Sequence, residues 1–279
     1  MQVREALKHG VERLTASRVG SPRMNAEVLL MFTLACDRAY LFAHPERDLT
    51  RDEQLRYEEA LADRAAGKPS QYITGHQEFW GMDLIVSPAV LIPRPETEHV
   101  IETVLRLVDP TSSPRIVDVG TGSGCIALAL AKELPLAEVH ATDISPGALE
   151  IARANAARHQ LENRIQFHET DLLRGLPLET FDLIVSNPPY VGESEEDEVQ
   201  LEVRKFEPRN AVFAGPTGLE VIERLIRQAQ TALKPGGWLV MEISGTILDG
   251  VKHLLNNWQQ GDIANDLQGI PRVASARKL

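Results

Sequence analysis

Apolar residues recur every three or four positions in the first part of the chain. Over residues 2–14 this spacing places them on one face of a helix, because residues three and four apart share a face. A Ser-Pro pair at 21–22 predicts the start of a second helix, and Thr50 with Glu53 forms the capping-box pattern that begins another. We therefore predict an N-terminal domain of three or four short helices over residues 1–70.

Residues 71–95 have a different pattern. Two β-like runs, WGMDLIV at 80–86 and AVLI at 89–92, are separated by a Ser-Pro pair, and we predict a β-hairpin linker over 71–95. Arg94 lies between two prolines, which stiffen its loop. Two roles are open for Arg94, a solvated brace and a residue of the functional site.

From residue 96 to residue 279, strand-like apolar runs alternate with helical stretches. The predicted strands are RIVDV, AEVHATD, RIQFHE, FDLIVS and GWLVMEI, and the predicted helices span about 124–133, 146–159, 216–233 and 247–258. This alternation is typical of an α/β domain with an open, mostly parallel sheet covered by helices on both faces. Ligands of such sheets bind at the carboxyl ends of the strands.

Charge and composition argue against several classes of function. The formal net charge is −11, and residues 1–75 hold eleven basic and eleven acidic side chains, so the excess acid lies after residue 75. A protein that binds phosphates would show a basic stripe, so we expect no direct nucleic-acid binding. No apolar run is long enough to cross a bilayer, and the first residues mix acids with bases, unlike a signal peptide. We expect a cytoplasmic monomer that does not bind membranes.

Cysteine and histidine do not form a recognisable site. The two cysteines lie far apart, and the eight histidines show neither HxxxH nor HxH spacing. We therefore expect no metal site and no Ser, Cys or His constellation for nucleophilic catalysis.

A glycine-rich loop follows the first strand of the second domain. It is made of Gly120, Thr121, Gly122, Ser123 and Gly124. Glycines there let a ligand approach the backbone, and the N-terminus of the next helix favours a phosphate or a carboxylate. Asp118 precedes the loop and either bonds the loop amides or faces the ligand.

One acidic residue ends the next predicted strand and another follows the strand after it. Asp143 lies 23 positions after Gly120, where a carboxylate accepts both hydroxyls of a ribose. Asp171 follows the third strand and is predicted to accept a hydrogen bond from an adenine amino group, while Leu172 packs on the ring. A cap or loop role for Asp171 is equally open.

The tetrapeptide Asn187, Pro188, Pro189 and Tyr190 ends the fourth strand. The nitrogen of a planar amide or aromatic amine is a poor nucleophile, because its lone pair is delocalised. The Asn187 side-chain oxygen and the Pro188 carbonyl can accept both N–H groups and align the lone pair. The prolines stiffen the backbone, and Tyr190 can lie against the planar group. The alternative is that an Asn-Pro-Pro turn merely ends the strand.

The loop, the ribose acid and the acid after the third strand resemble the class I S-adenosylmethionine-dependent methyltransferases. Further motifs resemble the peptide chain release factor glutamine methyltransferases, the HemK/PrmC family, over nearly the whole chain. These motifs are EFWG at 78–81, VLIPRPETE at 90–98, SNPPY at 186–190, EP at 207–208 and GIPRVASARK at 269–278.

The resemblance implies a Rossmann-like methyltransferase domain over 96–279 and an N-terminal domain that docks the substrate. It implies methyl transfer from S-adenosyl-L-methionine, leaving S-adenosyl-L-homocysteine. The acceptor would be the glutamine of the Gly-Gly-Gln motif of class 1 release factors, and the modification would modulate translation termination.

Position by position, the resemblance implies that the glycine loop, Asp143, Leu172 and Asn187 bind the cofactor, and that Asn187 to Tyr190 also bind the glutamine. The family often has an aromatic residue where this chain has Leu172. Ser244 and Ile247 stand where the family commonly has the Gly and Gln of E-x-G-x-x-Q.

Three other functions are weighed against this one. A sister group methylates a ribosomal-protein glutamine and shares NPPY, but PRPETE at 93–98 favours the release factor branch. Nucleic acid base-amine methyltransferases need phosphate contacts, which the acidic second domain does not favour. A non-enzymatic cofactor-binding scaffold would not need Asn187 and an intact glycine loop.

Overall fold

The computed structural model describes residues 1–279, which form two compact units. The first unit contains Met1–His76 together with Leu201–Phe206, and the second contains Gln77–Gln200 and Glu207–Leu279. A division into 1–70, 71–95 and 96–279 stays a prediction. The first unit is discontinuous in sequence, because a short segment from the second half of the chain packs with the N-terminal helices.

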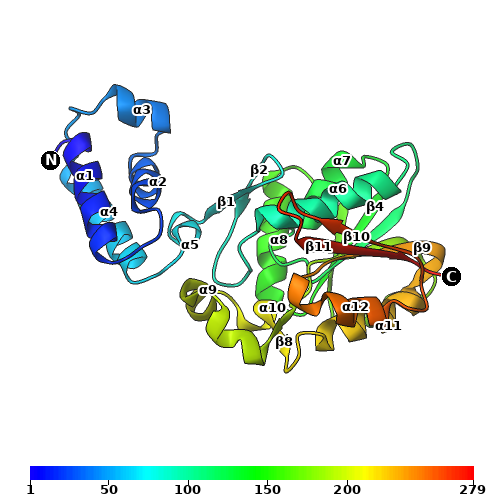
Figure 1. Cartoon of the computed structure of the whole chain (residues 1–279). Coiled ribbons are helices and arrows are strands. Elements are labelled where there is room, and N and C mark those ends of the chain that lie inside the picture. The colour runs from blue at the N-terminus through cyan, green and yellow to red at the C-terminus, as the bar shows by residue number, and fades with distance from the viewer. The chain divides into compact units, whose positions relative to one another are not determined.

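The first unit is helical (Figure 1). Its helices are α1 (Val3–Ala16), α2 (Pro22–Leu34), α3 (Arg38–Ala43), α4 (Arg51–Ala65), α5 (Ser70–Thr74) and α9 (Leu201–Phe206). The predicted capping box is present at the start of α4, where Glu53 N donates to Thr50 Oγ1 and Thr50 N donates to Glu53 Oε2. The apolar face of α1 is buried with Tyr57 and Leu61 of α4 in the core of this unit.

Helix α9 joins this unit through polar contacts. The guanidinium of Arg64 donates to Asn25 Oδ1 at 2.8 Å, to the Lys68 carbonyl at 3.0 Å and to Glu202 Oε2 at 2.9 Å. Arg64 is buried, so its charge is compensated by these three acceptors rather than by water. Residues more than a hundred positions apart in sequence are therefore tied together at this arginine.

The second unit is built on a seven-stranded sheet. Its strands are β3 (Arg115–Val119), β4 (Glu138–Asp143), β5 (Ile165–Glu169), β6 (Phe181–Ser186), β9 (Leu233–Glu242), β10 (Gln259–Asn265) and β11 (Pro271–Arg277). The order is β10-β11-β9-β6-β3-β4-β5. The five strands from β9 to β5 are parallel, and β10 and β11 extend the sheet in antiparallel pairing. The predicted mostly parallel sheet is confirmed.

Helices cover both faces of this sheet (Figure 1). One buried cluster joins the strands to α6 (Glu98–Leu107), α7 (Cys125–Glu133) and α8 (Pro146–Arg158). The other joins them to α11 (Glu220–Ala232) and α12 (Leu248–Leu254). The chain runs outward from β3 through β4 to β5 and then returns to the other side of β3 as β6. This reversal is the switch point at which open α/β sheets bind ligands.

The second unit also contains short elements. They are β1 (His76–Phe79), whose first residue belongs to the first unit, β2 (Met82–Ile85), β7 (Val191–Gly192), β8 (Phe213–Gly215), α10 (Arg209–Val212) and the 3-10 turns Pro95–Thr97, Glu193–Glu198 and Gly245–Ile247. The predicted strand AVLI at 89–92 is wrong. The hairpin pairs β1 with β2 instead, because Trp80 and Gly81 both have positive φ and form the two-residue turn.

Two helix limits also differ from the prediction. The helix expected from about 216 begins at Glu220, and the helix expected to reach 258 ends at Leu254. The first four residues of the earlier stretch include Pro216 and Gly218, which belong to the turn after β8. None of the helices combines the length and the apolar character that crossing a bilayer requires.

Candidate active site

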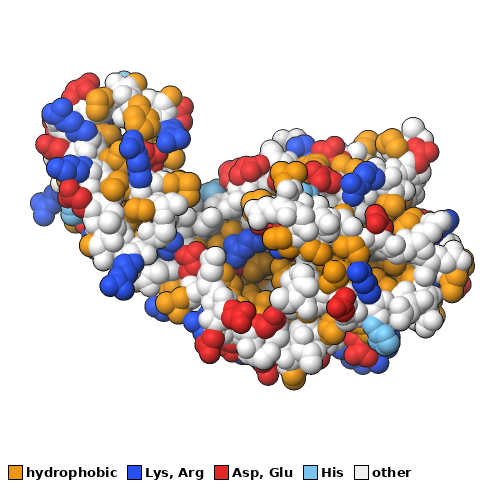
Figure 2. All heavy atoms as spheres, viewed as in Figure 1, with side chains coloured by type: hydrophobic (Ala, Val, Ile, Leu, Met, Phe, Trp, Pro, Cys, Tyr) orange, Lys and Arg blue, Asp and Glu red, His pale blue; other side chains and the backbone are white.

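A cavity of about 450 Å³ lies at the carboxyl ends of the central strands. Figure 2 shows hydrophobic side chains gathered in a hollow of the sheet-containing unit. The predicted site residues that line the cavity are Gly120, Thr121, Gly122, Ser123, Asp143, Asp171, Leu172, Asn187 and Pro189. Gly124, Pro188 and Tyr190 do not line it. Residues from four segments far apart in sequence thus meet at one cavity.

The glycine loop exposes its backbone to this cavity. Gly120 and Gly122 have φ of 71° and 55°, and no atom lies within 4 Å of where a Cβ would stand at either residue. Gly124 differs, because a Cβ there would lie 3.1 Å from Leu128 Cδ1 and 3.2 Å from Ala152 Cβ. The first two glycines therefore leave room for a ligand, whereas Gly124 allows α7 to pack closely on α8.

Asp118 holds the loop in shape. Its Oδ2 accepts hydrogen bonds from Thr121 Oγ1 at 2.6 Å and from Ala127 N at 3.1 Å, and its side chain is fully buried. Burial raises the pKa of Asp118 to about 7, although both hydrogen bonds favour the carboxylate. Of the two roles left open by the sequence, bonding to the loop and the start of α7 is the one that these contacts show.

Asp143 lies at the end of β4 and lines the cavity. Its Oδ2 accepts a hydrogen bond from Gly122 N and its Oδ1 accepts one from Ser145 N, both at 2.9 Å. Burial raises the pKa of this carboxyl group, and the backbone donors oppose that shift. The side chain is therefore held against the glycine loop by fixed backbone donors, which leaves lone pairs for hydroxyls of a ligand.

Asp171 and Leu172 follow β5, and both line the cavity. Asp171 forms an ion pair with Arg224 of α11. This partner could not be predicted from spacing, because 53 positions separate the two residues. Leu172 has a left-handed backbone with φ of 56°, which is uncommon for a residue with a branched side chain. The turn places the Leu172 side chain at the cavity wall.

Asn187 to Tyr190 follow β6 at the switch point. Ser186 Oγ donates to the Val119 carbonyl at 2.7 Å and fixes the ends of β6 and β3 together. Asn187 Nδ2 donates to Thr97 Oγ1 at 3.1 Å, and the Tyr190 hydroxyl donates to Glu242 Oε1 at 3.2 Å. No group of the protein donates to the Asn187 side-chain oxygen or to the Pro188 carbonyl. Both predicted acceptors are therefore available.

Three residues of this region, Thr97, Glu207 and Glu242, stand in motifs of the family resemblance but had no role in the prediction. Thr97 Oγ1 donates to Glu242 Oε2 at 2.6 Å, and both side chains are buried. Burial raises the pKa of Glu242.

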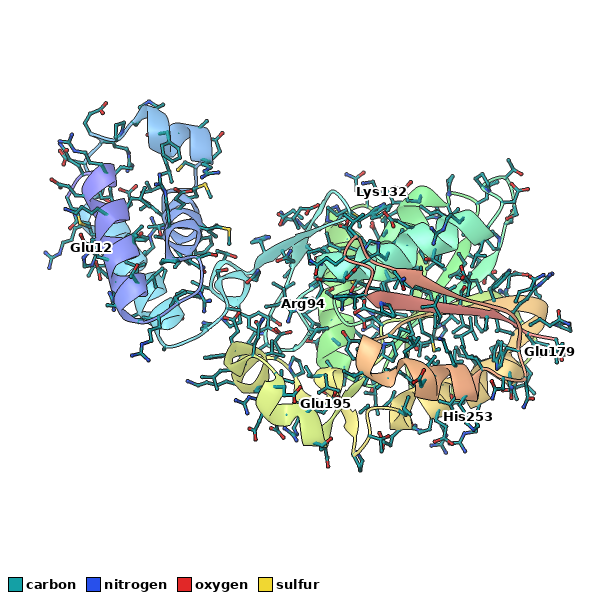
Figure 3. All side chains as sticks on the ribbon, viewed as in Figure 1. Glu12, Arg94, Lys132, Glu179, Glu195 and His253 are labelled. Carbon is teal, nitrogen blue, oxygen red and sulfur yellow. The ribbon has the colours of Figure 1, made fainter.

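Arg94, labelled in Figure 3, forms an ion pair with the buried Glu207, which also accepts a hydrogen bond from Ile92 N at 3.2 Å. Arg94 is thus a brace for the loop before α6 and is absent from the cavity lining.

Comparison with known proteins assigns the chain to a family. Two family models match the chain, the PrmC N-terminal domain at residues 5–75 and the methyltransferase small domain at residues 99–205. A release factor glutamine methyltransferase of Koribacter versatilis is 56% identical over all of this chain and 99% of its own length. The chain belongs to the release factor glutamine methyltransferase family.

A second member of this family, from Moorella thermoacetica, is 46% identical over 91% of this chain and 89% of its own length. The crystal structure of a methyltransferase from Pyrococcus furiosus has the same fold, with a TM-score of 0.53 at 20% identity, covering 71% of this chain and 89% of the other. The predicted class I methyltransferase fold is confirmed, and the protein is an S-adenosylmethionine-dependent methyltransferase.

The residues at the cavity fit this cofactor. The open space over Gly120 and Gly122 admits a group that contacts backbone amides, and Asp143 supplies acceptors for hydroxyls. The cavity is also of the size that small-molecule sites have, from roughly 300 to 1,000 Å³.

Proposed function

We propose that this protein methylates the side-chain amide nitrogen of the glutamine in the Gly-Gly-Gln motif of class 1 peptide chain release factors. One observation carries the chemistry. Asn187 lines the cavity and its amide nitrogen donates to Thr97, while no group of the protein donates to the Asn187 oxygen or to the Pro188 carbonyl. The names of the relatives support the identity of the substrate.

We propose the following roles at the cofactor end of the cavity. Gly120, Thr121, Gly122 and Ser123 would hold the methionine part, and Asp143 would accept the ribose hydroxyls. Leu172 would pack on the adenine, and the Asp171 oxygen that does not face Arg224 would accept from its amino group. Gly124 would contribute by allowing the close packing of α7 on α8.

The chain's own residues activate the glutamine by orientation and polarisation. S-adenosylmethionine supplies an electrophilic methyl group when bound. The Asn187 oxygen and the Pro188 carbonyl each accept one N–H of the substrate amide, which turns its lone pair toward the cavity and stabilises the positive charge that develops on the nitrogen. Tyr190 would lie against the planar amide. The nitrogen becomes acidic after methylation and loses its proton to water, so no strong general base is needed.

The proposal extends to the partner of this protein, its oligomeric state and its location in the cell. We propose that the first unit docks the release factor, that the protein acts as a monomer in the cytoplasm, and that it binds no nucleic acid directly. The acidic excess after residue 75 supports the last point, because nucleic-acid affinity depends on neutralising phosphates.

The test is transfer of a labelled methyl group from S-adenosylmethionine to a purified class 1 release factor. A matched control is the same factor with its Gly-Gly-Gln glutamine replaced by alanine. We expect label on the intact factor alone. Label on neither factor would contradict the proposal, and the same assay on ribosomal proteins and on RNA would then test the two rival substrate classes.

A further inference from the structure

Three polar side chains from distant segments form a chain of hydrogen bonds that ends at Asn187. Glu242 ends β9, Thr97 lies in the 3-10 turn before α6, and Asn187 follows β6. Thr97 Oγ1 lies 2.6 Å from Glu242 Oε2 and 3.1 Å from Asn187 Nδ2. Thr97 and Glu242 are 1% and 2% exposed, so water does not compete for the bond between them.

The direction of these bonds matters for Asn187. The oxygen and the NH2 group of a side-chain amide have nearly the same shape, and a half-turn exchanges them. Only the oxygen accepts an N–H of a substrate amide. In the reversed orientation, the Asn187 NH2 would face the NH2 of the glutamine, and one of the two acceptors that align the nitrogen would be lost.

The chemistry of Thr97 and Glu242 decides between these orientations. A hydroxyl has a single proton to donate, and the ionised carboxylate of Glu242, which the hydrogen bonds from Thr97 and Tyr190 favour, only accepts. Thr97 therefore gives its proton to Glu242 and offers a lone pair to its other neighbour. Asn187 must meet that lone pair with its NH2 group, which leaves its oxygen on the opposite side, free of any donor within the protein.

We propose that Thr97 and Glu242 are positioning residues, which fix the Asn187 side-chain amide so that its oxygen faces the substrate glutamine. This inference rests on the proposed function. The second oxygen of Glu242 accepts from the Tyr190 hydroxyl at 3.2 Å, so one buried carboxylate orients the first and last residues of the tetrapeptide. Thr97 lines the cavity but Glu242 does not, so Glu242 acts only through its partners.

The first test removes the Thr97 hydroxyl, which links Glu242 to Asn187. Thr97→Val keeps the shape of the side chain but has neither donor nor acceptor, whereas Thr97→Ser keeps the hydroxyl. We expect Thr97→Val to lower kcat about tenfold or more, with cofactor affinity unchanged in calorimetry. Thr97→Ser should stay close to the wild type. Thr103→Val is the matched control, because Thr103 is a buried threonine of α6 whose hydroxyl accepts from Arg106 instead.

A double-mutant cycle separates positioning from a general effect on folding. Asn187→Ala removes the group that Thr97 is proposed to orient, so Thr97→Val should cause no further loss of kcat in that background. An equal loss of kcat from Thr97→Val in both backgrounds would overturn the proposal. An unchanged kcat in the single variant would overturn it as well.

A second measurement needs neither substrate nor cofactor. In the free protein, the side-chain amide resonance of Asn187, assigned by its loss in Asn187→Ala, should show one hydrogen protected from exchange with water. Protection should be lost in Thr97→Val and kept in Thr97→Ser. An unprotected wild-type amide would overturn the positioning role even if Thr97→Val does not fold. Failure of the wild type to methylate the release factor would instead contradict the proposed function and leave this measurement unaffected.

Discussion

Asp143 is the residue on which cofactor affinity should depend most. Its carboxylate is fixed by Gly122 N and Ser145 N at the wall of the cavity. We expect Asp143→Ala to weaken S-adenosylmethionine binding by roughly 10- to 100-fold, since a hydrogen bond to a charged group contributes about 1.5–3 kcal/mol. Isothermal calorimetry measures this directly.

A matched control for this variant lies at the other end of the sheet. Asp182 of β6 accepts from Arg115 N and from Lys234 Nζ, far along the strand from the cavity lining. Asp182→Ala should leave cofactor affinity unchanged. Equal affinities for the Asp143→Ala variant and the wild type would refute the ribose role.

Asp118 should make stability depend on pH. Burial raises its folded pKa to about 7 from an ordinary value of 3.8, so ionisation costs more in the folded protein than in the unfolded one. The stability it contributes is therefore complete below about pH 4 and is lost as pH rises through about 7. Asp118→Asn carries no titrating group. Between about pH 4 and pH 7, its free energy of unfolding relative to that of the wild type should therefore rise by up to about 4 kcal/mol.

Urea unfolding of both proteins at several pH values tests this expectation. Other carboxyl groups titrate equally in the two proteins, so only the difference between them reports on Asp118. A difference that does not change between pH 4 and pH 7.5 would show that Asp118 is ionised at the same cost in both states.

Some residues of the site could be predicted from the sequence, and others are recognised only from their hydrogen bonds in the folded protein. Gly120, Asp143 and Asn187 follow predicted strands, and their spacing in sequence was enough to predict that they share a cavity. Thr97 and Glu242 lie 90 and 55 positions from Asn187, and their relevance comes from hydrogen bonds that only the folded sheet brings about. A motif predicts the residues proposed to bind a ligand more readily than the residues that orient them.

At the scale of elements, strong periodicity predicted the central strands and the helices between them. One of the two hairpin strands was predicted wrongly, because the turn requires a positive φ at Trp80, which the residue type does not suggest. Strand β10 was missed because its side chains are mostly exposed, so it lacks the apolar alternation that indicates a strand. Its pairing with β11 depends on contacts made after the sheet forms.

Packing between α1 and α4 depends on a glycine. A Cβ at Gly10 would lie 2.1 Å from the hydroxyl of Tyr57, which is fully buried and donates to the Ala26 carbonyl. Alanine gains about 1 kcal/mol of helix propensity over glycine, but overpacking of a core costs about 1–3 kcal/mol. We expect Gly10→Ala to lower the melting temperature, because the added methyl would force the fully buried Tyr57 ring to shift and strain its bond to Ala26.

Tyr57→Phe supplies the control for this prediction. It removes the hydroxyl, and the nearest remaining contacts of the added methyl would be at 3.1 and 3.2 Å. Gly10→Ala should therefore cost less in the Tyr57→Phe background than in the wild type, as measured by thermal unfolding. Equal costs in the two backgrounds would mean that another contact decides the effect.

At the scale of the whole molecule, the two units should separate binding of the cofactor from docking of the protein substrate. Every residue that lines the cavity belongs to the second unit. We expect deletion of residues 1–75 to leave cofactor affinity unchanged while raising KM for the release factor about tenfold or more. Calorimetry and steady-state kinetics measure the two effects, and an unchanged KM would contradict a docking role.

The deletion has a second consequence, because it also removes Arg64, which holds Glu202 of α9. A rise in KM would then have two possible sources, loss of the docking surface or release of the segment that follows the tetrapeptide. Full-length Arg64→Met distinguishes them, since it breaks the bond to Glu202 and keeps the N-terminal helices. If docking is the cause, KM should rise in the deletion and stay near the wild-type value in Arg64→Met, while amide exchange over 201–206 quickens in both. A KM that rises equally in both proteins would assign the effect to α9.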